Sequence, residues 1–251
     1  MDGYAQTAGT FIVYSLSEYA MAIQFDNRIT TDTLQRVSSF NALLHRQPFD
    51  GFRTSVPAYT TLSVFYDPLT VMQSECLTGV NCFERISGFL HGLRAEWTDT
   101  PMPVSVPIHI PLCYGGAFGP DLDDVARRLD TTPAEIIQLH STAIYHVYLI
   151  GFTPGFAYLG GMPERLAVPR KAMPSHNVVA GSVGIAGQQT GIYPLETPGG
   201  WQIIGRTPLR LFDVDSEQPS LLKAGDTVVF QVLDHQLFEQ YNTDQHADND
   251  K

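Results

Sequence analysis

The pattern of hydrophobic and polar positions changes near residue 100 and predicts a different fold on each side. In the first part, short apolar runs alternate with two segments whose apolar residues recur every three or four positions, which is the spacing of one helix face. This order is typical of an α+β domain with helices on an antiparallel sheet, and the ferredoxin-like fold is the closest simple match. The predicted elements are strands at 11–16, 21–25, 52–57 and 59–66 and helices at 30–46 and 68–96, the latter interrupted near Gly79.

A proline-rich stretch separates the two patterns. Residues 98–107 read TDTPMPVSVP, which holds few helix formers and three prolines that restrict the backbone. The stretch therefore predicts a stiff linker. We place an N-terminal domain at residues 1–98 and a second domain at residues 99–251.

The second part begins with a strand over 104–112, a glycine turn and two amphipathic helices. Thr132 and Glu135 form the capping-box pattern that opens the second of these helices. Over 145–233, short strands alternate with glycine and proline turns, which is typical of a closed β barrel rather than a parallel sheet. Residues 242–251 are polar and are predicted to form a disordered tail.

Glycine is concentrated in residues 151–205, which hold more than half of the 21 glycines of the chain. Glycine permits positive φ angles and close approach of backbones. The same stretch carries many large apolar residues that need burial, so it predicts ordered loops and short strands rather than a flexible linker. Ordered loops on a rigid frame often carry binding and catalytic groups.

Composition and charge narrow the class of protein. With 251 residues and 43% hydrophobic content, the chain can form packed cores in one large domain or two small ones. The formal net charge is −11 and there is no cluster of Lys and Arg, so nucleic acid is not an expected partner. No apolar run is long enough to span a membrane and no signal peptide is recognisable, so we expect a cytoplasmic protein without membrane contact.

Cysteine and histidine spacing predicts no metal site. Cys76, Cys82 and Cys113 are odd in number and lack CxxC spacing, so we expect buried thiols rather than disulfides or a zinc site. The histidines are scattered and show no HExxH motif. His140 lies on the apolar edge of its predicted helix and is expected to be a packing histidine.

Familiar catalytic and nucleotide motifs are absent from the sequence. There is no GxxxxGK[ST] loop, and the glycines at 181, 184 and 187 do not have dinucleotide-fingerprint spacing. Ser182 lies in AGSVG, which is not the GxSxG of a nucleophile elbow, so we predict a turn or pocket hydroxyl there. His176 lies in a polar loop and is a candidate proton carrier, with a solvated loop histidine as the alternative.

One polar cluster suits a small ligand. Gln188, Gln189, Thr190 and Tyr193 lie in a single loop, and Arg206 follows the next predicted strand. Amides, hydroxyls and a guanidinium with few acids nearby are suited to a ligand that bears a carboxylate or carbonyl. The alternative is that the first three of these residues only satisfy the backbone of a turn.

Four long motifs resemble a known family. They are VPAYTTLSVFYDP at 56–68, CYGGAFGPDLDDVA at 113–126, GFTPGFAYLGGMPERLAVPR at 151–170 and AGSVGIAGQQTGIYPLETPGGWQIIGRTPLRLF at 180–212. With these motifs, nearly the whole chain resembles the KipI/PxpB family, also called allophanate hydrolase subunit 1. The resemblance implies an N-terminal α+β domain followed by a mainly β, cyclophilin-like barrel.

The resemblance also implies a function. It points to one subunit of a bacterial 5-oxoprolinase that uses ATP, with Mg, as co-substrate and acts with PxpC-type and PxpA-type subunits. The substrate is then a small carboxylated lactam. From their residue chemistry we expect the QQTGIYP loop, Ser182 and Arg206 to bind it, with His176 as a candidate proton carrier. Two alternatives stay open, which are a KipI-like inhibitor of a sensor histidine kinase and a subunit related to allophanate hydrolase or urea carboxylase.

The chain departs from the usual family pattern at three positions. Ser175 stands where an arginine commonly follows the proline, Val179 where a proline is common, and Ala117 where the glycine turn often carries a glutamate. An arginine and a carboxylate are therefore missing near the motif core. We expect this loss to affect activity more than fold.

Overall fold

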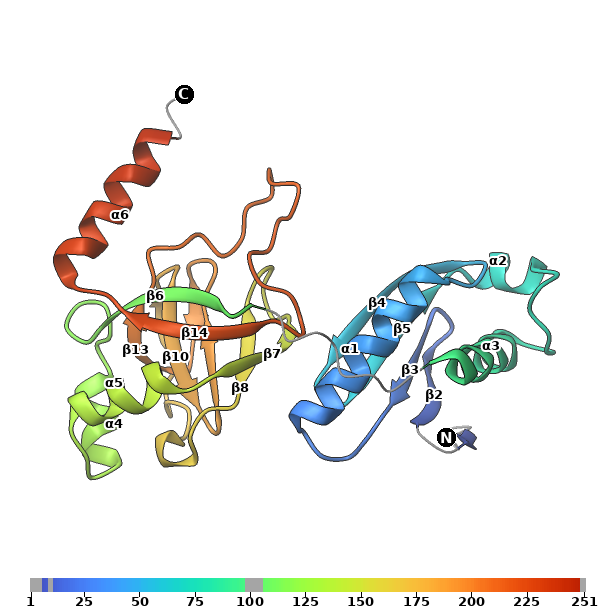
Figure 1. Ribbon diagram of the computed structural model, residues 1–251, viewed down its shortest axis with the longest axis horizontal. Helices are drawn as coiled ribbons and strands as arrows, with labels where there is room; N and C mark the ends of the chain where they lie inside the picture. Colours follow the sequence, from blue (N-terminus) through green and yellow to red (C-terminus); the bar gives the residue numbers. More distant parts are fainter. Residues whose placement is uncertain (1–5, 9–10, 98–105, 249–251) are drawn as a thin grey trace. The chain divides into compact units, whose positions relative to one another are not determined.

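The chain divides into two compact units, Met1–Val104 and Ser105–Lys251. The computed structural model in Figure 1 describes residues 6–8, 11–97 and 106–248, with side chains over 11–97 and 106–241. The domain boundary predicted at residue 98, and most of the predicted linker, lie outside these residues. Each unit has its own hydrophobic core.

The N-terminal unit is built on a five-stranded antiparallel sheet with the order β1-β2-β3-β5-β4. The predicted strands and helices of this unit are confirmed, including the break near Gly79, and β1 is an additional strand. The element order is not the β-α-β-β-α-β of the ferredoxin-like fold, so that prediction is not confirmed. The elements are β1 (Gln6–Ala8), β2 (Phe11–Ser17), β3 (Ala20–Gln24), α1 (Thr31–Arg46), β4 (Phe52–Ala58), β5 (Thr61–Tyr66), α2 (Pro68–Gln73) and α3 (Cys82–Glu96).

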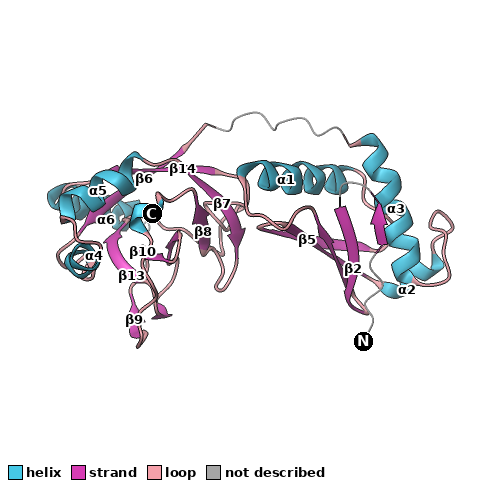
Figure 2. Ribbon diagram, turned by 90° about the horizontal axis from the view of Figure 1, so that it is seen from below, coloured by secondary structure: helices cyan, strands magenta, loops and turns pink. Residues whose placement is uncertain are grey.

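Helix α1 supplies much of the core of this unit. Its first turn is capped by Thr30, whose hydroxyl accepts a hydrogen bond from the Thr33 amide at 3.1 Å. Its apolar stripe, including Val37 and Phe40, is buried against strands β4 and β5 and against α3 (Figure 2). The alternation in β5 places Leu62 and its neighbours at every second position in this core, as the sequence predicts.

The C-terminal unit is a closed barrel of seven strands in the order β10-β11-β8-β7-β14-β6-β13. The predicted closed barrel is therefore confirmed. Its strands are β6 (Ile108–Tyr114), β7 (Tyr145–Ile150), β8 (Ala157–Gly160), β10 (Ser182–Ala186), β11 (Gln189–Ile192), β13 (Gln202–Arg206) and β14 (Thr227–Val232). The other elements are α4 (Leu122–Arg128), α5 (Pro133–Thr142), the 3-10 turn η1 (Glu164–Leu166), a ribbon of β9 (Ser175–Val178) and β12 (Thr197–Gly199), and α6 (His235–Asp248).

One prediction for this unit is confirmed and another is wrong in part. Thr132 caps α5 by accepting a hydrogen bond from the Glu135 amide at 3.2 Å, as the capping-box pattern predicts. The disorder predicted from residue 242 is wrong for 242–248, because α6 continues to Asp248. This helix begins after Asp234, whose carboxylate accepts a hydrogen bond from the Gln236 amide at 2.8 Å, and one of its side chains is buried. Residues 249–251 lie outside the described part of the chain.

A polar chain of hydrogen bonds links α5 to the barrel wall. The Tyr114 hydroxyl lies 2.7 Å from His140 Nδ1, and His140 Nε2 lies 3.0 Å from Thr190 Oγ1. Because the Thr190 hydroxyl donates to the Gly184 carbonyl at 3.0 Å, it accepts from Nε2–H, and Nδ1 then accepts from Tyr114. His140 is fully buried with both ring nitrogens bonded, so the predicted packing histidine is confirmed.

The stability of the barrel should fall in mild acid because of His140. Burial lowers the pKa of His140 from 6.5 to about 3, so below about pH 6.5 the unfolded chain binds more protons than the folded one. The contribution is complete above pH 6.5 and is lost as the pH falls towards 3, with about 2 kcal/mol lost at pH 5. Urea unfolding at pH 7 and pH 5, followed by Trp201 fluorescence in a Trp97→Phe background, measures this loss.

The matched control is His140→Gln. It should be less stable at pH 7 but lose less stability between pH 7 and pH 5 than the parent. Equal losses in the two proteins would contradict the role given to His140.

Gly119 lies where the turn after β6 crosses β13, and no side chain fits there. A Cβ at this position would overlap the Ile204 carbonyl oxygen, whereas a Cβ at Gly200 meets only Pro174, at 3.8 Å. We expect Gly119→Ala to destabilise the barrel by at least about 2 kcal/mol and Gly200→Ala to leave it within about 0.5 kcal/mol of the parent. The same urea assay compares the two variants, and equal midpoints would be inconsistent with this close approach.

Candidate functional site

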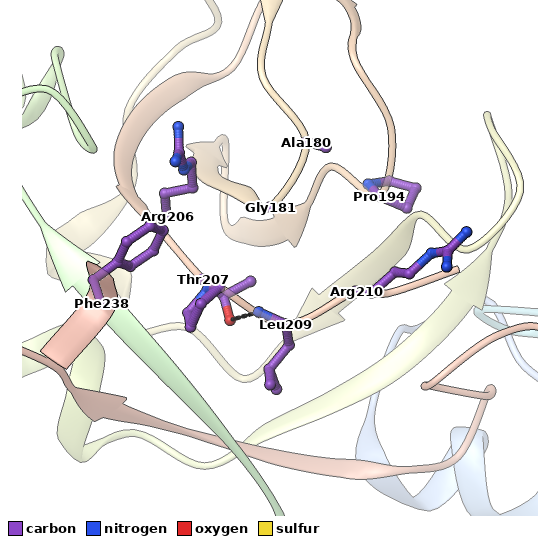
Figure 3. Close-up of a pocket in the computed structure, with 9 residues that line it drawn as sticks. Ala180, Gly181, Pro194, Arg206, Thr207, Leu209, Arg210 and Phe238 are labelled. Carbon is purple, nitrogen blue, oxygen red and sulfur yellow. Dashed lines mark hydrogen bonds between the residues drawn. The ribbon is translucent and has the colours of Figure 1, made fainter. Parts of the chain in front are cut away.

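A pocket of about 220 Å³ opens where three barrel strands end. It lies at the beginning of β10 and at the ends of β11 and β13, with one further wall from α6 (Figure 3). Its apolar wall is formed by Ala180, Gly181, Pro194, Pro208, Leu209 and Phe238, and its polar groups belong to Arg206, Thr207 and Arg210. None of the described residues that line it is acidic.

Gly181 brings these strand ends together. Its amide donates to the Tyr193 carbonyl at 2.7 Å, and its carbonyl accepts from the Thr207 amide at 2.9 Å. Gly181 has a φ of +82°, and a Cβ there would overlap the Thr207 carbonyl oxygen. Only glycine combines this φ angle with such a close approach, so the AGSVG motif sets the width of the pocket floor.

The donors that remain for a ligand are side chains. The Thr207 amide is bonded to Gly181, and the Leu209 amide donates to Thr207 Oγ1 at 3.2 Å. The Arg210 guanidinium pairs with Asp213 at 2.9 Å. Arg206 is half-buried, and no described carboxylate lies within ion-pair distance of its guanidinium. The pocket therefore offers a cation without an acidic partner in the described residues of a chain of net charge −11, which suits an anionic ligand.

Of the predicted site residues, one lines this pocket and two are neighbours in sequence of residues that line it. Arg206 lines it, while Ser182 and Tyr193 are buried immediately beside the lining residues Gly181 and Pro194. The Tyr193 amide donates to the Ser182 carbonyl at 2.8 Å, so these two residues fix the strand ends through their backbones. Burial raises the pKa of the Tyr193 phenol.

The structure does not bring Gln188, Gln189 and Thr190 to the pocket. The pairing of β10 with β11 places Ala186 opposite Gln189, at the far end of the hairpin from Ser182. Four residues of strand span about 13 Å. Gln188 is exposed there, and the Thr190 hydroxyl is engaged inside the barrel.

His176 also lies away from the pocket lining, exposed on the β9–β12 ribbon. The ribbon is anchored by Lys171, whose Nζ lies 2.6 Å from Asp121 Oδ2 and donates to Ser175 Oγ at 3.0 Å. Asp121 Oδ2 also accepts from the Ile203 amide at 2.6 Å. Ser175, one of the three departures from the family pattern, thus belongs to the anchor, while Val179 and Ala117 are exposed.

Sequence reasoning missed the aromatic side of the pocket. The Arg206 Cζ lies 5.1 Å from the centre of the Phe118 ring and 5.0 Å from that of Phe238. Phe118 belongs to the glycine turn after β6, and Phe238 comes from the segment next to the predicted tail. The available signal was one phenylalanine in the largely polar run HQLFEQ, a pattern that is also common on helices that bury one side chain.

The described part of the chain holds neither a metal-binding cluster nor a membrane-spanning helix. Over 6–8, 11–97 and 106–248, no group of three or more His, Cys, Asp and Glu residues could hold a metal ion. No helix in the same residues is long and apolar enough to cross a membrane.

The three cysteines are free thiols, but only one is fully buried. Cys113 is buried, Cys82 is partly exposed and Cys76 is exposed. The expectation of three buried thiols is therefore wrong for Cys76, which lies in the loop between α2 and α3. Burial raises the pKa of the Cys113 thiol.

Comparisons with known proteins agree with the motifs. The sequence profile of the family described as "Carboxyltransferase domain, subdomain C and D" matches residues 11–222. The B-type subunit of 5-oxoprolinase from Bacillus subtilis (strain 168) is 42% identical over 229 residues, which is 91% of this chain and 95% of that protein. The chain belongs to the KipI/PxpB family.

Two further relatives match different shares of this chain. The B-type subunit of 5-oxoprolinase from Haemophilus influenzae is 61% identical over 123 residues, which is 49% of this chain and 58% of that protein. The crystal structure of TTHA0988 superposes with a TM-score of 0.74 and 33% identity, over 86% of this chain and 40% of that chain. This KipI/PxpB chain thus corresponds to less than half of that longer protein.

The Lys171 anchor can be tested by hydrogen exchange. Lys171→Met leaves the largely buried Asp121 carboxylate without its ion pair, which should loosen the ribbon it holds. We expect amide exchange over 175–178 and 197–199 to speed up about tenfold or more, with the barrel strands unchanged. Lys223→Met, which removes the same charge from an exposed site, should leave exchange as in the parent. Unchanged ribbon exchange in Lys171→Met would show that other contacts hold it.

Proposed function

We propose that this chain is the B-type subunit of an ATP-dependent 5-oxoprolinase, which opens 5-oxoproline to glutamate together with PxpC-type and PxpA-type subunits. The observation that carries the proposal is the 42% identity to the B-type 5-oxoprolinase subunit of Bacillus subtilis over nearly the full length of both chains. We also propose that the complex is cytoplasmic and that the barrel is cyclophilin-like. Both extensions are predictions from the sequence.

The arginine pocket supports this substrate class. 5-Oxoproline is a small ring with one carboxylate and one lactam carbonyl. We propose that the Arg206 guanidinium binds the carboxylate, because it is a cation without an acidic partner among the described residues. The Thr207 hydroxyl proton is a further donor, and the methylene groups of the ring would contact Pro194 and Leu209.

Ring opening needs an activated carbonyl. In the proposed reaction the lactam oxygen takes the terminal phosphoryl group of ATP, which releases ADP. One water then adds to the carbon, and the C–N bond breaks as nitrogen gains a proton, which leaves an acyl phosphate. A second water hydrolyses the acyl phosphate to the carboxylate of glutamate and free phosphate. The pocket residues do not fit a triphosphate, because the backbone amides of Gly181, Thr207 and Leu209 are already hydrogen-bonded. We therefore assign to this chain the binding and orientation of the lactam and no step on ATP or Mg.

The predicted role of His176 as proton carrier requires the assembled complex. In this chain the ring is exposed on the ribbon and is not part of the pocket lining. A partner subunit that covers the ribbon would be needed to bring His176 and the lactam nitrogen together.

The test is reconstitution with the partner subunits, 5-oxoproline, ATP and Mg. Arg206→Gln should lower glutamate formation about 100-fold, because a desolvated carboxylate loses its charged partner. Arg128→Gln, which removes an exposed arginine on α4, is the matched control and should keep full activity. Wild-type rates in Arg206→Gln would contradict the assignment of the pocket.

Co-purification separates this function from its alternative. Recovery of PxpC-type and PxpA-type chains supports the oxoprolinase subunit. Recovery of a sensor histidine kinase, with no glutamate formed from 5-oxoproline, would favour the KipI-like inhibitor instead.

A further inference from the structure

Helix α6 buries one side chain of its first seven residues against the barrel. Among residues 235–241, Phe238 alone is buried, at 1% exposure, while Leu237 and Tyr241 are 48% and 42% exposed. The backbone enters the helix after the Leu233 amide donates to the Leu112 carbonyl at 2.9 Å. From there α6 leads away from the barrel strands (Figure 1). Its position therefore depends on what Phe238 contacts.

Phe238 contacts the two groups that define the cationic side of the pocket. Its ring centre lies 4.3 Å from that of Phe118 and 5.0 Å from the Arg206 Cζ. His235, one turn earlier on α6, also packs edge-on against Phe118, with ring centres 4.9 Å apart. Figure 3 shows the Phe238 ring beside the Arg206 side chain, at the edge of the pocket. The end of β13, the turn after β6 and the start of α6 thus meet around one guanidinium.

We propose that Phe238 is a positioning residue that holds the Arg206 guanidinium ready for an anion, so that α6 is a C-terminal clasp on this pocket. A long arginine side chain loses rotamer freedom when it binds a ligand, and that loss weakens binding. Two aromatic rings within cation–π distance restrain the guanidinium beforehand. Its N–H groups lie in the guanidinium plane and point outward from its edge, so they stay available for a carboxylate.

The clasp and the ligand are linked. If docked α6 improves anion binding, then a bound anion must stabilise docked α6 by the same factor. The part of this inference that concerns 5-oxoproline rests on the proposed function. The part that concerns the restraint of Arg206 by Phe238 does not.

The restraint is tested without any ligand, on the full chain, with phenylglyoxal as an arginine-modifying probe and mass spectrometry to locate each modified arginine. Phe238→Ala should increase the modification rate of Arg206 about tenfold, whereas Leu237→Ala, next to it on the helix, should not change it. Arg210 is the internal reference, because it lines the same pocket without stacking on Phe238. Phe238→Tyr should keep the parental rate, since it retains the ring. An unchanged Arg206 rate in a folded Phe238→Ala variant, as judged by circular dichroism, would overturn the proposal.

The linkage is tested by calorimetric titration of 5-oxoproline into the same variants. We expect Kd to rise about tenfold in Phe238→Ala and to stay near the parental value in Leu237→Ala and Phe238→Tyr. Equal Kd values in parent and Phe238→Ala would overturn the linkage while leaving the oxoprolinase assignment intact. The parent could fail to bind 5-oxoproline while Phe238→Ala still speeds up the modification of Arg206. That result would overturn the ligand assignment and support the clasp.

Discussion

Closure of the barrel is the constraint on which the rest of the C-terminal unit depends. Strand β14 pairs in parallel with β6 and antiparallel with β7, so the last strand seals a sheet begun more than a hundred residues earlier. Closure pairs the edge strands of the sheet with one another, which satisfies backbone groups that would otherwise be open. It also delivers the chain to α6 beside the end of β13. The arginine pocket is therefore a product of the topology as well as of the glycine motif that shapes its floor.

The barrel keeps its polar groups in two different environments. In the interior, Tyr114, His140 and Thr190 satisfy one another completely, which favours a single rigid arrangement. At the strand ends, Arg206 has aromatic contacts but no acidic partner among the described residues. The first arrangement stabilises the fold, whereas the second leaves binding capacity for another molecule. This contrast is the physical basis for assigning function to the pocket and a structural role to the histidine network.

Local signals in the sequence account for most of the fold. Alternation predicted β5, the hydroxyl of Thr132 predicted the start of α5, and glycine-punctuated strands predicted a closed barrel. The site was harder to predict, because residues that are close in sequence do not all lie at the same end of the barrel. Thr190 and Tyr193 are three residues apart, yet neither side chain lines the pocket. The Thr190 hydroxyl is bonded to His140 inside the barrel, and the Tyr193 ring packs against Phe156. The contribution of Phe238 depends on a contact with Phe118, more than a hundred residues away, and no local pattern reveals it.

The late position of β14 also affects how the protein is made. Residues 108–114 are synthesised long before residues 227–232. Until then β6 and β7 lack β14, the strand that lies between them in the barrel. During that interval their backbone groups present open edges, which can pair with other nascent chains. The N-terminal unit has its own core and needs none of these strands. Its folding can be complete while the edges of β6 and β7 are still open.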